Sequence, residues 1–243
     1  MSIILDEPHI ASVFDKDLRE IENQVVTMGG LVEKQLEDAA ELIVTRDLEL
    51  AKKLIGDDKT VDQLQEDIDA LVVRIIALRQ PKAQDLRSVL CAIKVASDLE
   101  RIGDYAKNLA KRMSVLAQVP PVGASARTIK RMCLMVRQMV KEVLDAYLAR
   151  DLAVAMDVRE RDEDVDQIHN NLFRTLLTYM LEDQRNITPC MHLLFISKNV
   201  ERMGDHATSI AEQIQFVITG DIPDDERPKG DTTSTVSIEP NPA

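Results

Sequence analysis

The residues Glu100-Arg101-Ile102-Gly103-Asp104 recur 101 positions later as Glu201-Arg202-Met203-Gly204-Asp205. The apolar residues around each copy keep the same 4-3-4-3-4 spacing, so the match extends well beyond the five residues. These apolar stripes consist of Val95, Leu99, Ile102, Ala106, Leu109 and Met113 in the first copy, and of Ile196, Val200, Met203, Ala207, Ile210 and Ile214 in the second. The repetition predicts one helical unit that is built twice.

Two shorter matches lie upstream of the motif, in the same order in each half. Arg46-Asp47-Leu48 corresponds to Arg150-Asp151-Leu152, and Val61-Asp62-Gln63 corresponds to Val165-Asp166-Gln167, both at an offset of 104 positions. Three matches in one order, with a three-residue difference in one connection, predict an internal duplication of the whole unit.

The composition favours long helices with an aliphatic core. Hydrophobic residues make up 45% of the 243 residues, aromatic residues only 3%, and charged residues 30%. The chain has only eight glycines, and apolar residues recur at three- and four-residue steps. These features predict an all-α protein without strands.

Breaks in the apolar rhythm divide the chain into six helices. Asp47 is a predicted N-cap, Gln80-Pro81 ends one helix, and Pro120-Pro121-Val122-Gly123 separates the two halves. The predicted helices cover residues 11–44, 48–79, 83–117, 128–148, 152–182 and 188–219. We expect two tandem three-helix bundles related by internal duplication, residues 1–119 and 124–219, because this arrangement buries every apolar stripe. From residue 220 the rhythm stops, which predicts a disordered tail over 220–243.

Charge and cysteine content narrow the partners and the compartment. The net charge of −12 repels phosphate backbones and anionic headgroups, which argues against nucleic-acid binding and against direct membrane binding. The most apolar stretch, residues 70–78, is interrupted by Arg74 and is too short to span a bilayer, and we find no signal peptide. The three cysteines are scattered, as expected of reduced thiols in a cytoplasmic protein: Cys91, Cys133 and Cys190.

Pairs of carboxylates four residues apart recur at equivalent positions in the two halves. Each pair shares a helix face that lies away from the apolar stripe, so we expect these side chains to point away from the core. One interpretation is a solvated face of an acidic protein. The other is a metal site, since pairs on adjacent helices would offer oxygen ligands to Mg²⁺, Mn²⁺, Ca²⁺ or iron. The candidate ligands are Glu100, Asp104, Asp58 and Asp62 in the first half, and Glu201, Asp205, Asp162 and Asp166 in the second.

Glycine and arginine complete the repeated motif. Glycine inside a helix costs about 1 kcal/mol relative to alanine. Gly103 and Gly204 therefore predict a neighbouring helix that approaches the backbone closely at the same place in each half. We expect Arg101 and Arg202 to neutralise nearby carboxylates. His206 corresponds to a tyrosine in the first half, and we interpret this unmatched histidine as structural.

The sequence lacks the short motifs of familiar enzyme classes. It has no Gly-x-Ser-x-Gly, no P-loop, no Gly-x-Gly-x-x-Gly and no His-Glu-x-x-His motif. It also lacks the paired, inward-facing Glu-x-x-His motifs of ferritin-type sites. The chain is therefore predicted not to be an enzyme. A metal-dependent helical-bundle enzyme, such as an iron–carboxylate oxidase, and a purely structural helical scaffold remain the alternatives.

These motifs resemble those of the PhoU family, the phosphate-specific transport system accessory proteins of bacteria. The resemblance covers residues 14–220 and rests on residues 98–106 with Asn108, on residues 199–207 and on residues 77–81. It implies a pair of three-helix bundles in a cytoplasmic, commonly homodimeric protein.

The resemblance also implies a function, partners and a metal. The implied role is negative regulation of the phosphate-starvation (Pho) response and modulation of phosphate uptake. The protein would link the phosphate ABC transporter, through its ATPase subunit, to a membrane sensor histidine kinase of a two-component system, so membrane contact would be indirect. Some relatives carry multinuclear metal clusters on Glu/Asp-x-x-x-Asp motifs. These correspond here to Glu100 and Asp104 and to Glu201 and Asp205, with Fe, Mg, Mn and Zn as candidate metals.

Overall fold

Six long helices make up the part of the chain that the structure describes. The computed structural model describes residues 7–221 and Thr233. The elements are α1 (Glu7–Thr45), α2 (Leu48–Arg79), α3 (Gln84–Leu116), α4 (Ser125–Ala149), α5 (Leu152–Glu182), a short 3₁₀ turn η1 (Gln184–Asn186) and α6 (Ile187–Thr219). No strand occurs over these residues, so the all-α prediction is confirmed. The predicted tail lies outside the described residues, apart from residues 220, 221 and 233.

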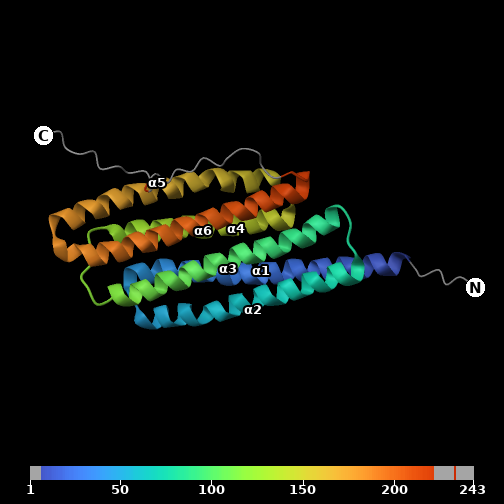
Figure 1. Cartoon of the computed structure of the whole chain (residues 1–243), viewed down its shortest axis with the longest axis horizontal. Coiled ribbons are helices and arrows are strands. Elements are labelled where there is room, and N and C mark those ends of the chain that lie inside the picture. The colour runs from blue at the N-terminus through green and yellow to red at the C-terminus, as the bar shows by residue number, and fades with distance from the viewer. Residues whose placement is uncertain (1–6, 222–232, 234–243) are drawn as a thin grey trace, which may run out of the picture.

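The helices form two three-helix bundles that pack lengthwise against each other (Figure 1). Helices α1, α2 and α3 contact one another, and so do α4, α5 and α6. Helix α3 also lies against α6, and α1 against α4, so α2 and α5 lie at opposite edges of the molecule. The predicted tandem bundles are therefore confirmed, and their buried apolar residues form one core cluster.

The repeated Arg-Asp-Leu sequence forms the same helix reversal in both halves. Arg46 and Arg150 adopt the left-handed backbone conformation, with φ of 57° and 54°, directly after α1 and α4. The Asp47 carboxylate then accepts hydrogen bonds from the backbone N–H groups two and three residues later, and Asp151 does the same. These two aspartates cap α2 and α5, which confirms Asp47 as an N-cap.

The repeated Glu-Arg-x-Gly-Asp motif lies in α3 and α6, which we call the motif helices. The predicted apolar stripes of both motif helices are fully buried. Each of their twelve residues is at most 2% exposed. Burying one aliphatic side chain contributes about 1.5–3 kcal/mol, so these stripes are a major stabilising element of the bundles. Helix α2 likewise buries Val61, Ile68 and Ile75, whereas Leu78 in its last turn is 67% exposed.

The remaining sequence features agree with a helical core and short connections. The three cysteines are free and buried. Helix α2 ends at Arg79, and Gln80 caps it in the left-handed conformation directly before Pro81, where the sequence predicted the end of this helix. None of the described helices combines the length and the apolar character that a bilayer span requires.

Candidate functional site: two buried carboxylate clusters

Several of the predicted carboxylates lie between helices and not on the outer surface. Asp58, Asp162 and Asp166 are 2% exposed, and Glu201 is 4% exposed. The expectation that the pairs point away from the core is therefore wrong for these residues. Each motif helix is covered by three neighbours, because α3 contacts α1, α2 and α6, and α6 contacts α3, α4 and α5. A face turned away from the apolar stripe is thus still covered by another helix.

Gly103 and Gly204 mark the places where polar side chains of neighbouring helices approach the motif helices. A Cβ atom on Gly204 would lie 2.5 Å from Oδ1 of Asp162 in α5. A Cβ atom on Gly103 would lie 3.0 Å from Oε1 of Gln35 in α1 and 3.7 Å from Oδ1 of Asp58 in α2. The predicted close approach is confirmed in both halves. Gly204 thus makes room for the carboxylate of Asp162, whereas the closest neighbour of Gly103 is the side-chain amide of Gln35.

Lys107 joins the carboxylates of the first half. Its Nζ donates a short hydrogen bond to Oδ2 of Asp58 and a second one, of 2.6 Å, to Oδ1 of Asp104. The ammonium group thereby links α2 to α3. Arg101 lies 3.6 Å from Glu100 and 3.7 Å from Asp104, as the sequence predicted for this arginine.

We call Asp58, Asp62, Glu100 and Asp104 the first carboxylate cluster, and their counterparts in α5 and α6 the second. Burial and charge shift the pKa values of the first cluster. Burial raises the pKa of Asp58, and the contact with Lys107 opposes the rise. Burial also raises the pKa of Glu100, and the charges of Asp104 and Asp62 add to it, while Arg101 opposes it. Burial alone would lower the pKa of Lys107, but the hydrogen bonds to Asp104 and Asp58 outweigh it and hold this pKa above its usual range. The carboxylates of α2 and α3 therefore lie close enough to shift one another's pKa values.

Glu201 has a strongly shifted pKa in the second half. Burial raises the pKa of Glu201 to about 7, while a 2.6 Å hydrogen bond from Lys198 lowers it and the charges of Asp205 and Asp166 raise it further. Glu201 therefore exchanges its proton near neutral pH. The acids from α5 and α6 lie close enough to influence this equilibrium, so the second cluster also spans two helices.

Sequence reasoning missed the side chains that neutralise the clusters. Lys107 follows Asp104 by three residues, a spacing that brings helical side chains together, so this contact could have been found. Its counterpart 101 positions later is Thr208, whose Oγ1 donates to the carbonyl of Gly204 at 2.9 Å. The two clusters thus differ at this position. The approach of Gln35 depends on how α1 packs against α3, and no local pattern predicts it.

Contacts between the halves surround Tyr105 on α3 and His206 on α6, which occupy equivalent positions. Nδ1 of His206 lies 2.8 Å from Oδ1 of Asp98, and its ring centre is 5.8 Å from that of Tyr105. The guanidinium carbon of Arg202 lies 6.0 Å from the centre of the same tyrosine ring. His206 therefore connects the two halves, and its structural role stays a prediction. For Arg202 the structure shows this aromatic contact in place of the carboxylate contact expected from the sequence.

The carboxylates have the chemistry of a metal site but not its geometry. Oxygen ligands suit hard cations. Over residues 7–221, however, no group of three or more His, Cys, Asp or Glu side chains is arranged to hold a metal ion. In the first half, Lys107 contacts two of the four candidate ligands, Asp58 and Asp104. The metal site predicted from the sequence therefore stays a prediction.

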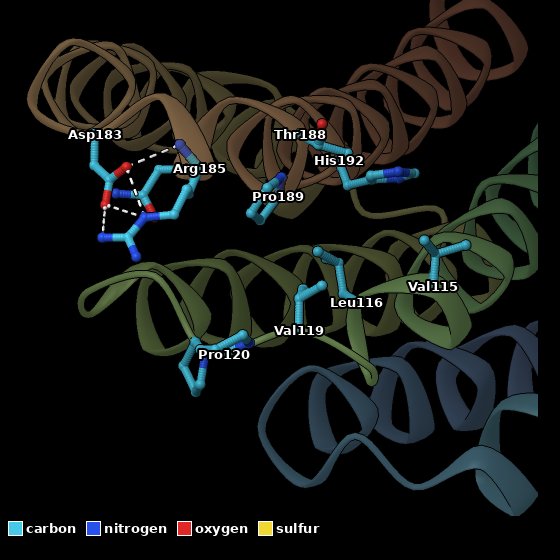
Figure 2. Close-up of a pocket in the computed structure, with 11 residues that line it drawn as sticks. Val115, Leu116, Val119, Pro120, Asp183, Arg185, Thr188, Pro189 and His192 are labelled. Carbon is cyan, nitrogen blue, oxygen red and sulfur yellow. Dashed lines mark hydrogen bonds and ion pairs between the residues drawn. The ribbon is translucent and has the colours of Figure 1, made fainter.

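A separate hollow lies between the α3–α4 connection and the start of α6 (Figure 2). Its volume is about 440 Å³, and an Asp183–Arg185 ion pair of 2.8 Å lies at its rim. The other lining residues are mainly apolar: Val115, Leu116, Val119, Pro120, Pro121, Asn186, Thr188, Pro189 and His192. None of the predicted carboxylates lines this hollow, so it is distinct from the two clusters.

Comparison with known sequences gives matches over both halves. The family described as "PhoU domain" matches residues 25–113 and 129–214. A Rhizobium meliloti (strain 1021) protein, named phosphate-specific transport system accessory protein PhoU homolog, is 46% identical over 232 residues, 96% of this chain and 98% of the relative. The Escherichia coli (strain K12) phosphate-specific transport system accessory protein PhoU is 39% identical over 214 residues, 87% of this chain and 88% of the relative.

Two solved structures have a similar fold. A crystal structure of PhoU from Pseudomonas aeruginosa gives a TM-score of 0.83 at 36% identity, and the match covers 86% of this chain and 100% of that one. The phosphate transport system regulatory protein PhoU from Streptococcus pneumoniae gives a TM-score of 0.81 at 27% identity, with 87% and 99% coverage. The two family matches fall one in each half of the internal repeat.

Proposed function

Because this chain belongs to the PhoU family, we propose that it represses the phosphate-starvation response when phosphate is plentiful and modulates phosphate uptake. The observation that carries this proposal is the match to relatives named as phosphate-specific transport system accessory proteins over almost the full length of both chains. An accessory role of this kind needs specific contacts and no turnover of a substrate. The proposal therefore assigns no catalytic residue.

The proposed mechanism is a bridge between two protein partners. One partner is the ATPase subunit of the phosphate ABC transporter, and the other is the cytoplasmic part of a sensor histidine kinase. The protein would act in the cytoplasm as a homodimer and reach the membrane only through these partners. Its long helices offer extended faces for docking. The net charge of −12 favours basic partner surfaces and disfavours nucleic acid and anionic lipid.

A separate proposal concerns the two carboxylate clusters, which we infer to bind a hard divalent or ferric cation. The donor chemistry supports it, since each cluster offers carboxylates from two helices. The electrostatics of Glu201 support it as well: burial raises the pKa of this residue most, the charges of Asp205 and Asp166 add to the rise, and a cation would neutralise those charges. The side chains would have to turn towards a common point, since their present arrangement among the described residues does not form a metal site.

Deleting the gene tests the regulatory proposal. Null cells in phosphate-rich medium should express alkaline phosphatase at starvation levels, and a plasmid copy of the gene should restore repression. If null cells keep phosphatase expression low in abundant phosphate, the regulatory proposal fails. Co-purification of the tagged protein with the transporter ATPase and with the kinase, each tested separately, shows which contact carries the signal.

A further inference from the structure

We propose that the ammonium group of Lys107 is a built-in cation of the first carboxylate cluster, where it excludes a metal ion from the first half of the chain. This inference rests on the proposed cation binding by the carboxylates and concerns its distribution between the two halves.

The position of Nζ carries the argument. Lys107 donates hydrogen bonds to Asp58 on α2 and to Asp104 on α3, which are two of the four candidate ligands. A metal ion that bridged α2 and α3 would need oxygen atoms of the same two carboxylates. A divalent ion at that place would lie within a few ångströms of the ammonium group, and like charges repel strongly where water is scarce. The lysine and the metal ion are therefore mutually exclusive.

Burial makes the lysine hard to displace. The side chain of Asp58 is 3% exposed and that of Lys107 is 22% exposed. Removing one partner of a buried ion pair leaves an uncompensated charge, so an incoming ion must replace the ammonium group while breaking two charge-assisted hydrogen bonds.

The second half has no lysine at the position equivalent to Lys107. Its equivalent residue, Thr208, is fully buried and neutral, and its hydroxyl donates to the Gly204 carbonyl of its own helix. The lysine of the second cluster, Lys198, comes from a different position, where the first half has Ser97, and it contacts Glu201 three residues further along α6. A substitution at position 107 therefore changes the first cluster alone.

The test is a count of bound Mn²⁺ ions per chain. Purified protein, stripped with chelator, is titrated with Mn²⁺, and the free ion is measured by electron paramagnetic resonance. Lys107→Thr, which copies the second half, should bind one more Mn²⁺ ion per chain than the wild type. Lys107→Arg, which keeps the positive charge, should bind the same number as the wild type. Lys111→Thr, at an exposed position one turn later on α3, controls for the change in net charge.

The outcomes separate this inference from the general cation proposal. If Lys107→Thr binds the same number of Mn²⁺ ions as the wild type, the inference is overturned, whatever that number is. If the extra ion appears, adding Asp104→Asn to the Lys107→Thr variant should remove it, and an extra ion that persists also overturns the inference. If Lys107→Thr is unfolded in chelator, Mn²⁺ should restore its helical circular dichroism. Failure to restore it would also overturn the inference. Absence of binding to the wild type with one ion on Lys107→Thr would overturn only cation binding in the second half.

Discussion

The carboxylate of Asp162 in α5 lies directly against the backbone of Gly204 in α6. A Cβ atom on this glycine would be 2.5 Å from Oδ1 of Asp162 and 3.8 Å from a methyl carbon of Val136. The aspartate is 2% exposed and its side chain is short, so it has little freedom to move aside. The glycine thus allows the carboxyl side chain of Asp162 to pack between two helices.

Gly204→Ala should therefore destabilise the protein, by about 1–3 kcal/mol, the range typical of overpacking in a dense interior. The added methyl group must displace Asp162 from its place between α5 and α6. The measurement is the free energy of unfolding from urea titration, in buffer with chelator.

Gly56→Ala is the matched control for this prediction. Gly56 lies in α2, where a Cβ atom would meet no heavy atom within 4 Å. The intrinsic helix preference of alanine should then stabilise the control by about 0.5–1 kcal/mol. Equal effects of the two substitutions would mean that Asp162 moves aside without cost.

Replacing Glu201 should change how stability depends on pH. The pKa of Glu201 is about 7 in the folded protein and near 4.5 in the unfolded chain. Between these values the folded state binds more protons, so stability is highest below about pH 4.5 and falls as pH rises towards 7. Glu201→Gln removes this loss and should raise the free energy of unfolding at pH 8 by roughly 3 kcal/mol, less what the weakened Lys198 contact costs.

Urea titrations of metal-free protein at several pH values between 4.5 and 8 measure this difference. Glu160→Gln, at an exposed position on α5, is the control and should follow the wild type throughout. A wild-type slope between pH 5 and 7 that survives in Glu201→Gln would show that another group causes it.

Local patterns predicted the elements of this fold because the chain repeats them. The stripe from Val95 to Met113 has helical spacing along its whole length. Its burial confirmed which face of α3 packs against the core. The N-cap at Asp47 could be predicted because its carboxylate acts on backbone N–H groups only two and three residues later. Helix ends and faces are local properties, and the sequence displays them directly.

The environment of the carboxylates could not be predicted in the same way. Whether Asp58 meets water or a second helix depends on how α2 packs against α3, which the period of one helix does not contain. The glycine at position 103 signalled a close approach but not its chemistry. The contact between Asp98 and His206 joins residues 108 positions apart and depends on the packing of the two halves.

Cation binding by the clusters should stabilise the protein by mass action. At a concentration one hundred times the dissociation constant, a bound ion adds about 2.7 kcal/mol to the free energy of unfolding. Excess Mn²⁺ should therefore raise the melting temperature of the wild type, and the double variant Asp104→Asn/Asp205→Asn should lose this gain. If Lys107 blocks the first half, Asp205→Asn alone should remove it.

Differential scanning fluorimetry with and without Mn²⁺ measures these shifts. Asp164→Asn is the control, because Asp164 is an exposed carboxylate between Asp162 and Asp166 on the same helix. It should keep the full Mn²⁺-dependent shift. An undiminished shift in the double variant would leave these acids without a role in metal binding.

The proposed regulatory role depends on the packing beside Gly103. A Cβ atom there would lie 3.0 Å from Gln35, 3.6 Å from Val61 and 3.7 Å from Asp58, which come from two neighbouring helices. The branched side chain of Gly103→Leu has no room, so α1 and α2 must shift and the faces they present to partners change. Cells with Gly103→Leu as their only copy should express alkaline phosphatase in phosphate-rich medium, approaching the level of the null strain.

Two further measurements make this last outcome interpretable. Gly56→Leu, at an exposed position of α2 with open space around it, should repress phosphatase like the wild type. Immunoblotting of the tagged variants shows whether Gly103→Leu remains at normal abundance, and pull-down of the transporter ATPase shows whether the contact is lost. A folded, abundant Gly103→Leu variant that still represses phosphatase would mean that regulation does not depend on how these helices pack, because the distortion would then leave the signalling contacts intact.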